Sequence, residues 1–184
     1  WSSDVCSSDL GGRRHLAMLP EKTMQQLPWS RDFSASVRAL RRHRGKQVVI
    51  LASGDPFDFG AADAIARTFD ASEFVVLPTV GSVALACAVL GWSRQQVEVV
   101  TVHGRPLEAL HLQLTPGAKL LILSRDRHSP VQIAALLAER GFGPSGMTVL
   151  ERLGGPAEKK VTGDRKSTRL NSSHVSESRM PSSA

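Results

Sequence analysis

The residues best suited to hold a small ligand lie in a short polar turn that follows an apolar run. Gln47–Ala52 reads QVVILA, and Ser53, Gly54 and Asp55 come directly after it. Such a run is typical of a strand buried in a parallel sheet, and open α/β sheets bind ligands beyond the carboxyl ends of such strands. Gly54 would permit close backbone approach, and a carboxylate beside free amides suits a polar cofactor. The alternative is a helix start capped by Asp55, with Pro56 at its first position.

Two cationic stretches could bind carboxylates. Arg14 and His15 follow a pair of glycines, and His103 and Arg105 follow the β-branched run VEVVTV. Arginine can hold a carboxylate through two parallel hydrogen bonds, so both stretches would suit a substrate rich in acetate and propionate groups. The alternative for each stretch is a turn with polar surface residues. Ser124 ends a further apolar run and is followed by Arg125 and Asp126, which could simply pair in a helix-entry loop.

Several chemistries are disfavoured by missing motifs. The sequence has no CxxC pair, HExxH, GxxxxGK[ST] or GxSxG, so we predict no metal site, no phosphate-binding loop and no serine nucleophile. The chain has 2 cysteines, and Cys87 stands in an apolar run typical of a small buried thiol. The N-terminus also lacks the basic-then-apolar pattern of a secretory signal peptide, so we expect a cytoplasmic location.

Charge and composition allow more than one partner. The formal net charge is +6, which fits a solvated basic surface, nucleic acid or a polyanionic small molecule. Aromatic residues make up 5% with no tyrosine, a poor supply for stacking bases, so nucleic acid is not favoured. No apolar run approaches the roughly 20 residues of a membrane span.

Short apolar runs alternate with helical patterns, which predicts an α/β fold with a mainly parallel sheet and right-handed crossovers. Strands are expected at 47–52, 74–77, 97–102, 119–123 and 148–150, and helices at 31–44, 60–68, 82–90, 107–112 and 130–140. Ser129 is expected to cap the last helix, which has Pro130 at its start and Gly141 just past its end.

The organisation we predict has two lobes between two unrelated ends. Residues 11–78 form an N-terminal α/β lobe and residues 79–163 a C-terminal one, with a ligand cleft between them. Segments 1–10 and 164–184 are Ser-rich, lack hydrophobic periodicity and resemble translated adapter or vector sequence, so we expect them to lie outside the packed fold. On this reading both lobes are truncated, the native chain is longer, and the chain as written is inactive.

Six blocks together resemble the precorrin-6Y C(5,15)-methyltransferase branch of the tetrapyrrole methylases. In order they are GGRRHLAMLP, VVILASGDPFDFGAA, VLPTVGSVALACAVLGW, VEVVTVHGRPLEAL, KLLILSRDRHSP and ERGFGPSGMTVLERLGGP. Single blocks are weak signals, but six in register are specific, and GGRRHL and HGRP look particular to this branch.

This resemblance implies a two-lobed tetrapyrrole-methylase-like fold with parallel and mixed sheets, usually dimeric, that binds S-adenosylmethionine between its lobes. Cofactor contacts would come from Ser53, Gly54 and Asp55, from Gly81 and Ser82, and from Ser124. The substrate side would include Arg14, His15, His103 and Arg105. The activity implied is C-methylation of a precorrin in cobalamin biosynthesis. A separate or fused domain would complete the second methylation and remove a carboxyl group.

The implied reaction is a direct displacement at the sulfonium methyl. The electron-rich macrocycle is its own nucleophile, so the protein supplies alignment and electrostatics, and no catalytic side chain is assigned. Two alternatives stay open. One is another methyltransferase of the same fold, similar to diphthine synthase or to rRNA-modifying enzymes. The other is a non-catalytic α/β binding module, because fold alone does not give function.

Overall fold

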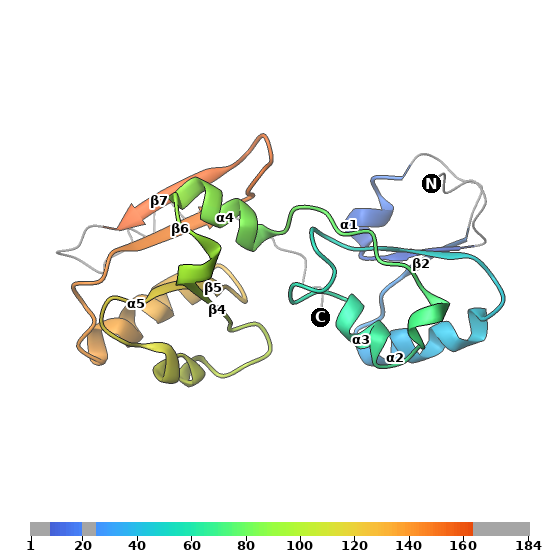
Figure 1. Cartoon of the computed structure of the whole chain (residues 1–184), viewed down its shortest axis with the longest axis horizontal. Coiled ribbons are helices and arrows are strands. Elements are labelled where there is room, and N and C mark those ends of the chain that lie inside the picture. The colour runs from blue at the N-terminus through green and yellow to red at the C-terminus, as the bar shows by residue number, and fades with distance from the viewer. Residues whose placement is uncertain (1–7, 20–24, 164–184) are drawn as a thin grey trace. The chain divides into compact units, whose positions relative to one another are not determined.

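The structure is a computed structural model that describes residues 8–19 and 25–163 (Figure 1). The described residues form two compact units, one ending at Gly81 and the other beginning at Ser82. Each unit has its own sheet and helices. We treat each as a separate scaffold for the residues that it carries.

The first unit is built on a three-stranded parallel sheet. Its strands are β1 (Ser8–Gly11), β2 (Gln25–Pro28) and β3 (Val48–Leu51), in the order β2-β1-β3. Leu10 of β1 lies opposite Leu27 and Ile50 on its two neighbours, so apolar side chains meet across the sheet. All three strands end at the same edge, where Gly11 and Leu51 are paired.

Short helices follow these strands. They are α1 (Arg13–Leu16), α2 (Phe33–Ala39), η2 (Leu40–His43), α3 (Ala62–Ala66) and η3 (Ala71–Glu73). Asp32 begins α2, because its carboxylate accepts a hydrogen bond from the Ala35 amide at 2.8 Å. Each of the first four helices buries at least one apolar residue, namely Leu16, Val37, Leu40, Ala62 and Ile65.

The second unit contains a parallel pair of strands and an antiparallel pair. Its elements in order are α4 (Ser82–Leu90), η4 (Arg94–Gln96), β4 (Val97–Thr101), η5 (Leu107–Gln113), β5 (Lys119–Leu123), α5 (Ser129–Glu139), β6 (Met147–Glu151) and β7 (Lys159–Gly163). β4 runs parallel to β5, and β6 runs antiparallel to β7.

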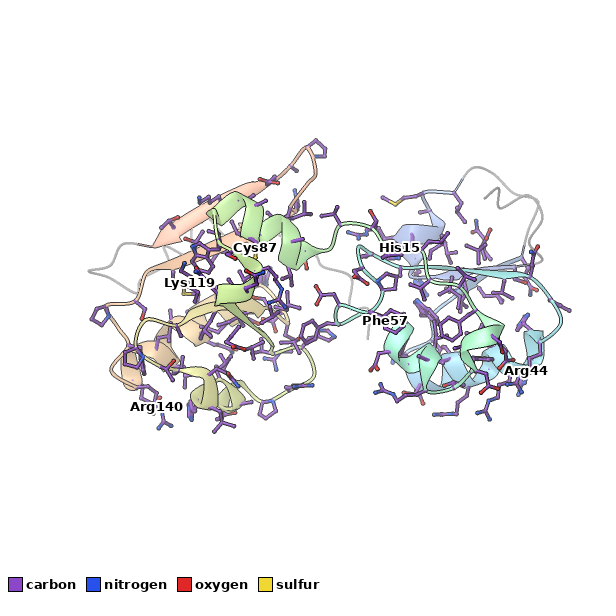
Figure 2. The ribbon with its side chains drawn as sticks, in the orientation of Figure 1. His15, Arg44, Phe57, Cys87, Lys119 and Arg140 are labelled. Atoms are coloured by element: carbon purple, nitrogen blue, oxygen red, sulfur yellow. The ribbon has the colours of Figure 1, made fainter. Side chains whose placement is uncertain are left out.

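Two apolar clusters hold these elements. Val102, Leu110, Ile133 and Leu136 form one, which joins the loop after β4 to η5 and α5. Val83, Cys87 and Val97 form the other, between α4 and β4. Cys87 is a buried free thiol, as the sequence predicts (Figure 2).

The predicted α/β class with parallel sheets is confirmed, and most predicted elements are present. The runs at 47–52, 97–102 and 119–123 contain β3, β4 and β5, and the run at 148–150 lies within β6. The predicted strand at 74–77 is wrong, because this segment has no strand pairing and Val75 and Leu77 are 73% and 63% exposed. A β-branched run indicates a strand only where another strand is available to pair with it.

The predicted cap of α5 is also wrong. The residue before α5 is His128, and the Ser129 hydroxyl instead accepts hydrogen bonds from the amides of Arg125 and Asp126, at 3.2 and 3.1 Å. The Asp126 carboxylate accepts from the amides of His128 and Ser129, both at 2.9 Å, and so performs the capping role. Gly141 follows the helix with a positive φ of 81°, as predicted.

The N-terminal end differs from expectation at three residues. Ser8, Asp9 and Leu10 are only 3%, 4% and 4% exposed and form most of the central strand β1. The expectation that residues 1–10 lie outside the packed fold is therefore wrong for these three. Strand pairing uses backbone groups that any residue supplies, so a polar sequence can be held between two better strands. Segments 1–7 and 164–184 lie outside the described residues.

Among the helices of the described ranges, none is both long and apolar enough to cross a membrane.

Candidate functional site

The turn after β3 is shaped by a close backbone contact at Gly54. Gly54 has a φ of +58°, and a Cβ built on it would lie 2.8 Å from the Cα of Gly81 and 3.3 Å from the Val80 carbonyl oxygen. The Gly54 carbonyl accepts a hydrogen bond from the Thr79 amide at 3.3 Å. Gly54 and Gly81, two predicted cofactor residues, are therefore in direct contact, and Gly81, expected at the start of the second lobe, belongs to the first unit.

Asp55 stabilises this turn and keeps part of its carboxylate available. Its Oδ1 accepts the Phe57 amide at 2.9 Å, and its backbone carbonyl accepts the Asp58 amide at 3.1 Å. No helix starts at Pro56, because α3 begins at Ala62. The helix-start alternative is thus not observed. Within the described residues, the second oxygen of Asp55 makes no hydrogen bond or ion pair.

Arg14 and His15 approach the same turn from α1, and Figure 2 labels His15. His15 Nε2 lies 2.8 Å from Ser53 Oγ, in a hydrogen bond whose donor depends on the imidazole tautomer, and Arg14 Nη2 lies 3.5 Å from the same oxygen. His15 Nδ1 is buried and has no partner among the described residues. Ser53 therefore joins two residues predicted for the substrate side to the predicted cofactor turn.

The environment of His15 favours its neutral form. Partial burial of the imidazole lowers the pKa of His15 from its usual value near 6.5, and the nearby positive charge of Arg14 lowers it further. At neutral pH the ring is uncharged, with one nitrogen able to accept a proton. This arrangement provides a weak base next to a hydroxyl and a fixed positive charge.

The second unit places three of the predicted residues, His103, Arg105 and Ser124, just beyond one sheet edge. Thr101 and Leu123 are paired at the ends of β4 and β5, so the loops that begin there leave the sheet on the same side. His103 and Arg105 are in the first loop, and Ser124 begins the second. Ser82, also predicted to contact the cofactor, is the first residue of α4.

The two loops border a small open hollow of about 10 Å³, which has room for about one water molecule. Its lining is Val102, Arg105, Leu107, Arg125, Ser129 and Gln132. Sequence reasoning assigned no ligand role to Arg125 or Gln132. The signal available for Arg125 was its position directly after Ser124 at the end of a strand, while Gln132 lies in α5, and only the fold brings it to this hollow.

No group of three His, Cys, Asp or Glu side chains positioned to hold a metal ion occurs within residues 8–19 and 25–163. The predicted site residues of the two units supply hydroxyls, guanidinium groups, two imidazoles and one carboxylate. Such groups bind an organic ligand through hydrogen bonds and charge.

The chain matches the family described as Tetrapyrrole (Corrin/Porphyrin) Methylases over residues 5–168. It belongs to this family. The predicted resemblance is thereby confirmed, and the turn at Gly54 and the strand-end loops of the second unit are those of a tetrapyrrole methylase.

Relatives of this tetrapyrrole methylase include two precorrin-6Y C(5,15)-methyltransferases. The protein from Sinorhizobium sp is 42% identical over 153 residues, which is 83% of this chain and 37% of the relative. The protein from Mycobacterium tuberculosis is 37% identical over 155 residues, which is 83% of this chain and 38% of the relative. The chain thus spans less than two fifths of the length of these relatives.

Solved structures share the fold of this tetrapyrrole methylase. A precorrin-6Y methylase from Archaeoglobus fulgidus matches with a TM-score of 0.63 and 24% identity, over 89% of this chain and 79% of that one. A uroporphyrin-III C-methyltransferase from Thermus thermophilus, solved with S-adenosylhomocysteine, matches with a TM-score of 0.64 and 21% identity, over 97% and 79% of the two chains. At these identities the likeness shows the fold.

Proposed function

We propose that the protein performs S-adenosylmethionine-dependent C-methylation of a precorrin, of the precorrin-6Y C(5,15) type, in cobalamin biosynthesis. The observation that carries this proposal is the contact between Gly54 and Gly81 at the carboxyl end of β3. It leaves room for backbone only and lies where α/β sheets bind ligands. The family membership and the names of the relatives support the reaction type.

The residues around this contact fit the cofactor chemically. Ser53 offers a hydroxyl, Gly54 and Gly81 allow close backbone approach, and Asp55 has one carboxylate oxygen that is free within the described residues. A carboxylate suits the ammonium group of the methionine part or the ribose hydroxyls. We assign Ser82 and Ser124 to the cofactor as well, from the first residue of α4 and the end of β5.

When bound, S-adenosylmethionine supplies an activated methyl group on a positively charged sulfur. The bound cofactor would supply this methyl to a substrate carbon, with the methyl–sulfur bond breaking as the new bond forms, so no serine or cysteine of the protein needs to act as a nucleophile. The role of the chain is to align carbon, methyl and sulfur and to exclude water. The Arg14 guanidinium and the neutral His15 imidazole at Ser53 supply the polar groups of this part of the site.

The substrate side would use cationic residues for the carboxylates of the macrocycle. We assign Arg14 and His15 in the first unit and His103 and Arg105 in the second. The same proposal includes a homodimer, a cytoplasmic location, and a fused or separate decarboxylating methyltransferase domain. The last of these is consistent with relatives named as decarboxylating, whose chains are much longer than this one.

Photolabelling tests this assignment. The purified chain is irradiated with ultraviolet light in the presence of methyl-labelled S-adenosylmethionine and then digested for mass spectrometry. We expect label in peptides that contain residues 53–55 or 81–82, and we expect excess S-adenosylhomocysteine to remove it. Label confined to other peptides, or label that the competitor leaves unchanged, would contradict the proposal.

A further inference from the structure

The loop after β3 fixes the backbone of Asp58. The Asp58 amide donates a hydrogen bond to the Asp55 carbonyl at 3.1 Å. Phe57, which Figure 2 labels, donates its amide to Asp55 Oδ1 at 2.9 Å. Farther along, the Ala62 amide donates to the Pro56 carbonyl at 3.0 Å, which closes the loop at the start of α3. Asp58 is half-buried, and these contacts fix the position from which its side chain leaves the loop.

Gly81 leaves a small space beside this loop. A Cβ built on Gly81 would lie 3.5 Å from the Asp55 amide nitrogen, 3.6 Å from Asp55 Cβ and 3.6 Å from Asp58 Oδ2. These distances are ordinary van der Waals contacts, and among the described residues outside 80–82 no atom lies closer. A group the size of a methyl or a hydroxyl therefore fits where glycine has no side chain, in contact with Asp55 and Asp58.

The two polar groups at this space are available to a ligand. Within residues 8–19 and 25–163, the Asp55 amide donates no hydrogen bond, and the Asp58 carboxylate makes neither a hydrogen bond nor an ion pair. A backbone N–H only donates, and a carboxylate only accepts. A ligand group that satisfies both must accept one hydrogen bond and donate another.

This requirement favours one group of S-adenosylmethionine over the others. Its ammonium only donates and its carboxylate only accepts, so each suits one of the two neighbours and not the other. The adenine carries its donors and acceptors on separate atoms of a ring that is too large for a methyl-sized space. A ribose hydroxyl donates and accepts through a single oxygen atom, and it matches the size of the space.

We propose that Asp58 and the Asp55 amide bind one ribose hydroxyl of S-adenosylmethionine in the space beside Gly81. The inference rests on the proposed function for the identity of the ligand. It gives Asp58 a binding role, and it explains why position 81 needs a residue without a side chain. Asp58 also makes the site selective for a ribonucleoside, because a deoxy analogue leaves the carboxylate and the amide without their partner.

Calorimetric titration of the full chain with S-adenosylhomocysteine and with its 2′-deoxy and 3′-deoxy analogues tests this contact. One of the two analogues should bind about tenfold more weakly than the parent, because it lacks a charge-assisted hydrogen bond. In Asp58→Ala the three ligands should bind with affinities within about threefold of one another. Asp63→Ala, which removes an exposed acid of α3, is the matched control and should keep the selectivity.

Gly81→Ala provides a second test that keeps both hydrogen-bonding groups. Gly81 is not among the glycines with positive φ, and the added methyl would meet its neighbours at 3.5 Å or more, so the chain should fold. The methyl occupies the space proposed for the hydroxyl. S-adenosylhomocysteine should therefore bind about tenfold more weakly, while thermal unfolding stays close to that of the unmodified chain.

The results separate this inference from the proposed function. Saturable binding of S-adenosylhomocysteine, with a preference over one deoxy analogue that Asp58→Ala abolishes, supports the contact. Equal binding of all three ligands by the unmodified chain, or a preference that survives Asp58→Ala, overturns the contact and leaves the methyltransferase proposal standing. Failure of the folded, unmodified chain to bind S-adenosylhomocysteine would defeat the proposed function and this inference with it.

Discussion

His15 Nε2 lies 2.8 Å from Ser53 Oγ, although 38 residues separate them in the chain. The contact joins α1 to the turn after β3. Arg14 Nη2 lies 3.5 Å from the same Ser53 oxygen. A residue assigned to the substrate and a residue assigned to the cofactor thus share one hydrogen bond. On the proposed function, the two ligands meet at this point of the first unit.

The pKa of His15 should lie below that of an exposed histidine. Burial and the charge of Arg14 both disfavour the imidazolium, so Arg14→Gln should raise the pKa of His15 toward its usual value near 6.5. Nuclear magnetic resonance titration of the imidazole protons measures this, with His15→Gln to assign the signal. A pKa at or above the usual value, unchanged by Arg14→Gln, would show that the imidazole is solvated and that Arg14 is remote from it.

The same shift has a consequence for stability. Because the folded-state pKa of His15 is lower than the unfolded one, the unfolded chain binds more protons between the two values. The contribution of His15 to the free energy of unfolding is therefore fully present above the unfolded pKa and is lost as pH falls through this window. Denaturant unfolding from pH 7.5 to 5 should show a smaller loss for His15→Gln than for the unmodified chain.

Gly54→Ala should destabilise the first unit more than Gly45→Ala does. Both glycines have positive φ, so both substitutions carry a backbone cost of about 1–2 kcal/mol. A Cβ on Gly54 also meets Gly81 Cα at 2.8 Å, whereas a Cβ on Gly45 meets nothing within 4 Å. We expect Gly54→Ala to cost about 1–3 kcal/mol more in denaturant unfolding. Equal costs would mean that the contact with Gly81 is absent in solution.

Asp9→Val should stabilise the protein. Asp9 is 4% exposed in the central strand, and its Oδ1 has no hydrogen-bond partner among the described residues. Replacing a buried carboxyl that has one unpaired oxygen by a β-branched side chain should gain about 1–3 kcal/mol in the free energy of unfolding. Glu98→Val, an exposed acid in β4, should change it by less than about 0.5 kcal/mol. A loss of stability on Asp9→Val would contradict the burial of this residue.

A strand can be predicted from the sequence where its own residues show a recognisable hydrophobic pattern. The runs that contain β3, β4 and β5 are rich in valine, isoleucine and leucine, so each can be recognised as a strand from its own residues. β1 and β2, with the sequences SDLG and QQLP, have no comparable pattern. Their place in the sheet comes from pairing with β3 and with each other, which is a property of the tertiary fold.

The same difference between local sequence signals and long-range contacts applies to the candidate site. Ser53, Gly54 and Asp55 could be singled out because a polar turn after a buried strand is a local signal. The contacts of Gly54 with Gly81 and of Ser53 with His15 join distant segments, so only the fold reveals them. The ion pair of Arg125 with Asp126, one alternative that the sequence offers, is present at 3.2 Å, whereas the hollow that Arg125 and Arg105 both line joins distant segments and is visible only in the fold.

Binding of S-adenosylhomocysteine, measured by calorimetry on the unmodified chain, Asp55→Asn and Asp63→Asn, tests the central claim most directly. Asparagine at position 55 can still accept the Phe57 amide, so this change removes the charge while keeping the turn. Asp63 is a matched acid with an exposed ion pair to Arg67. We predict one site per chain, about tenfold weaker binding for Asp55→Asn and no change for Asp63→Asn. A folded, unmodified chain with no saturable binding would contradict the assignment of a methyltransferase site to this turn.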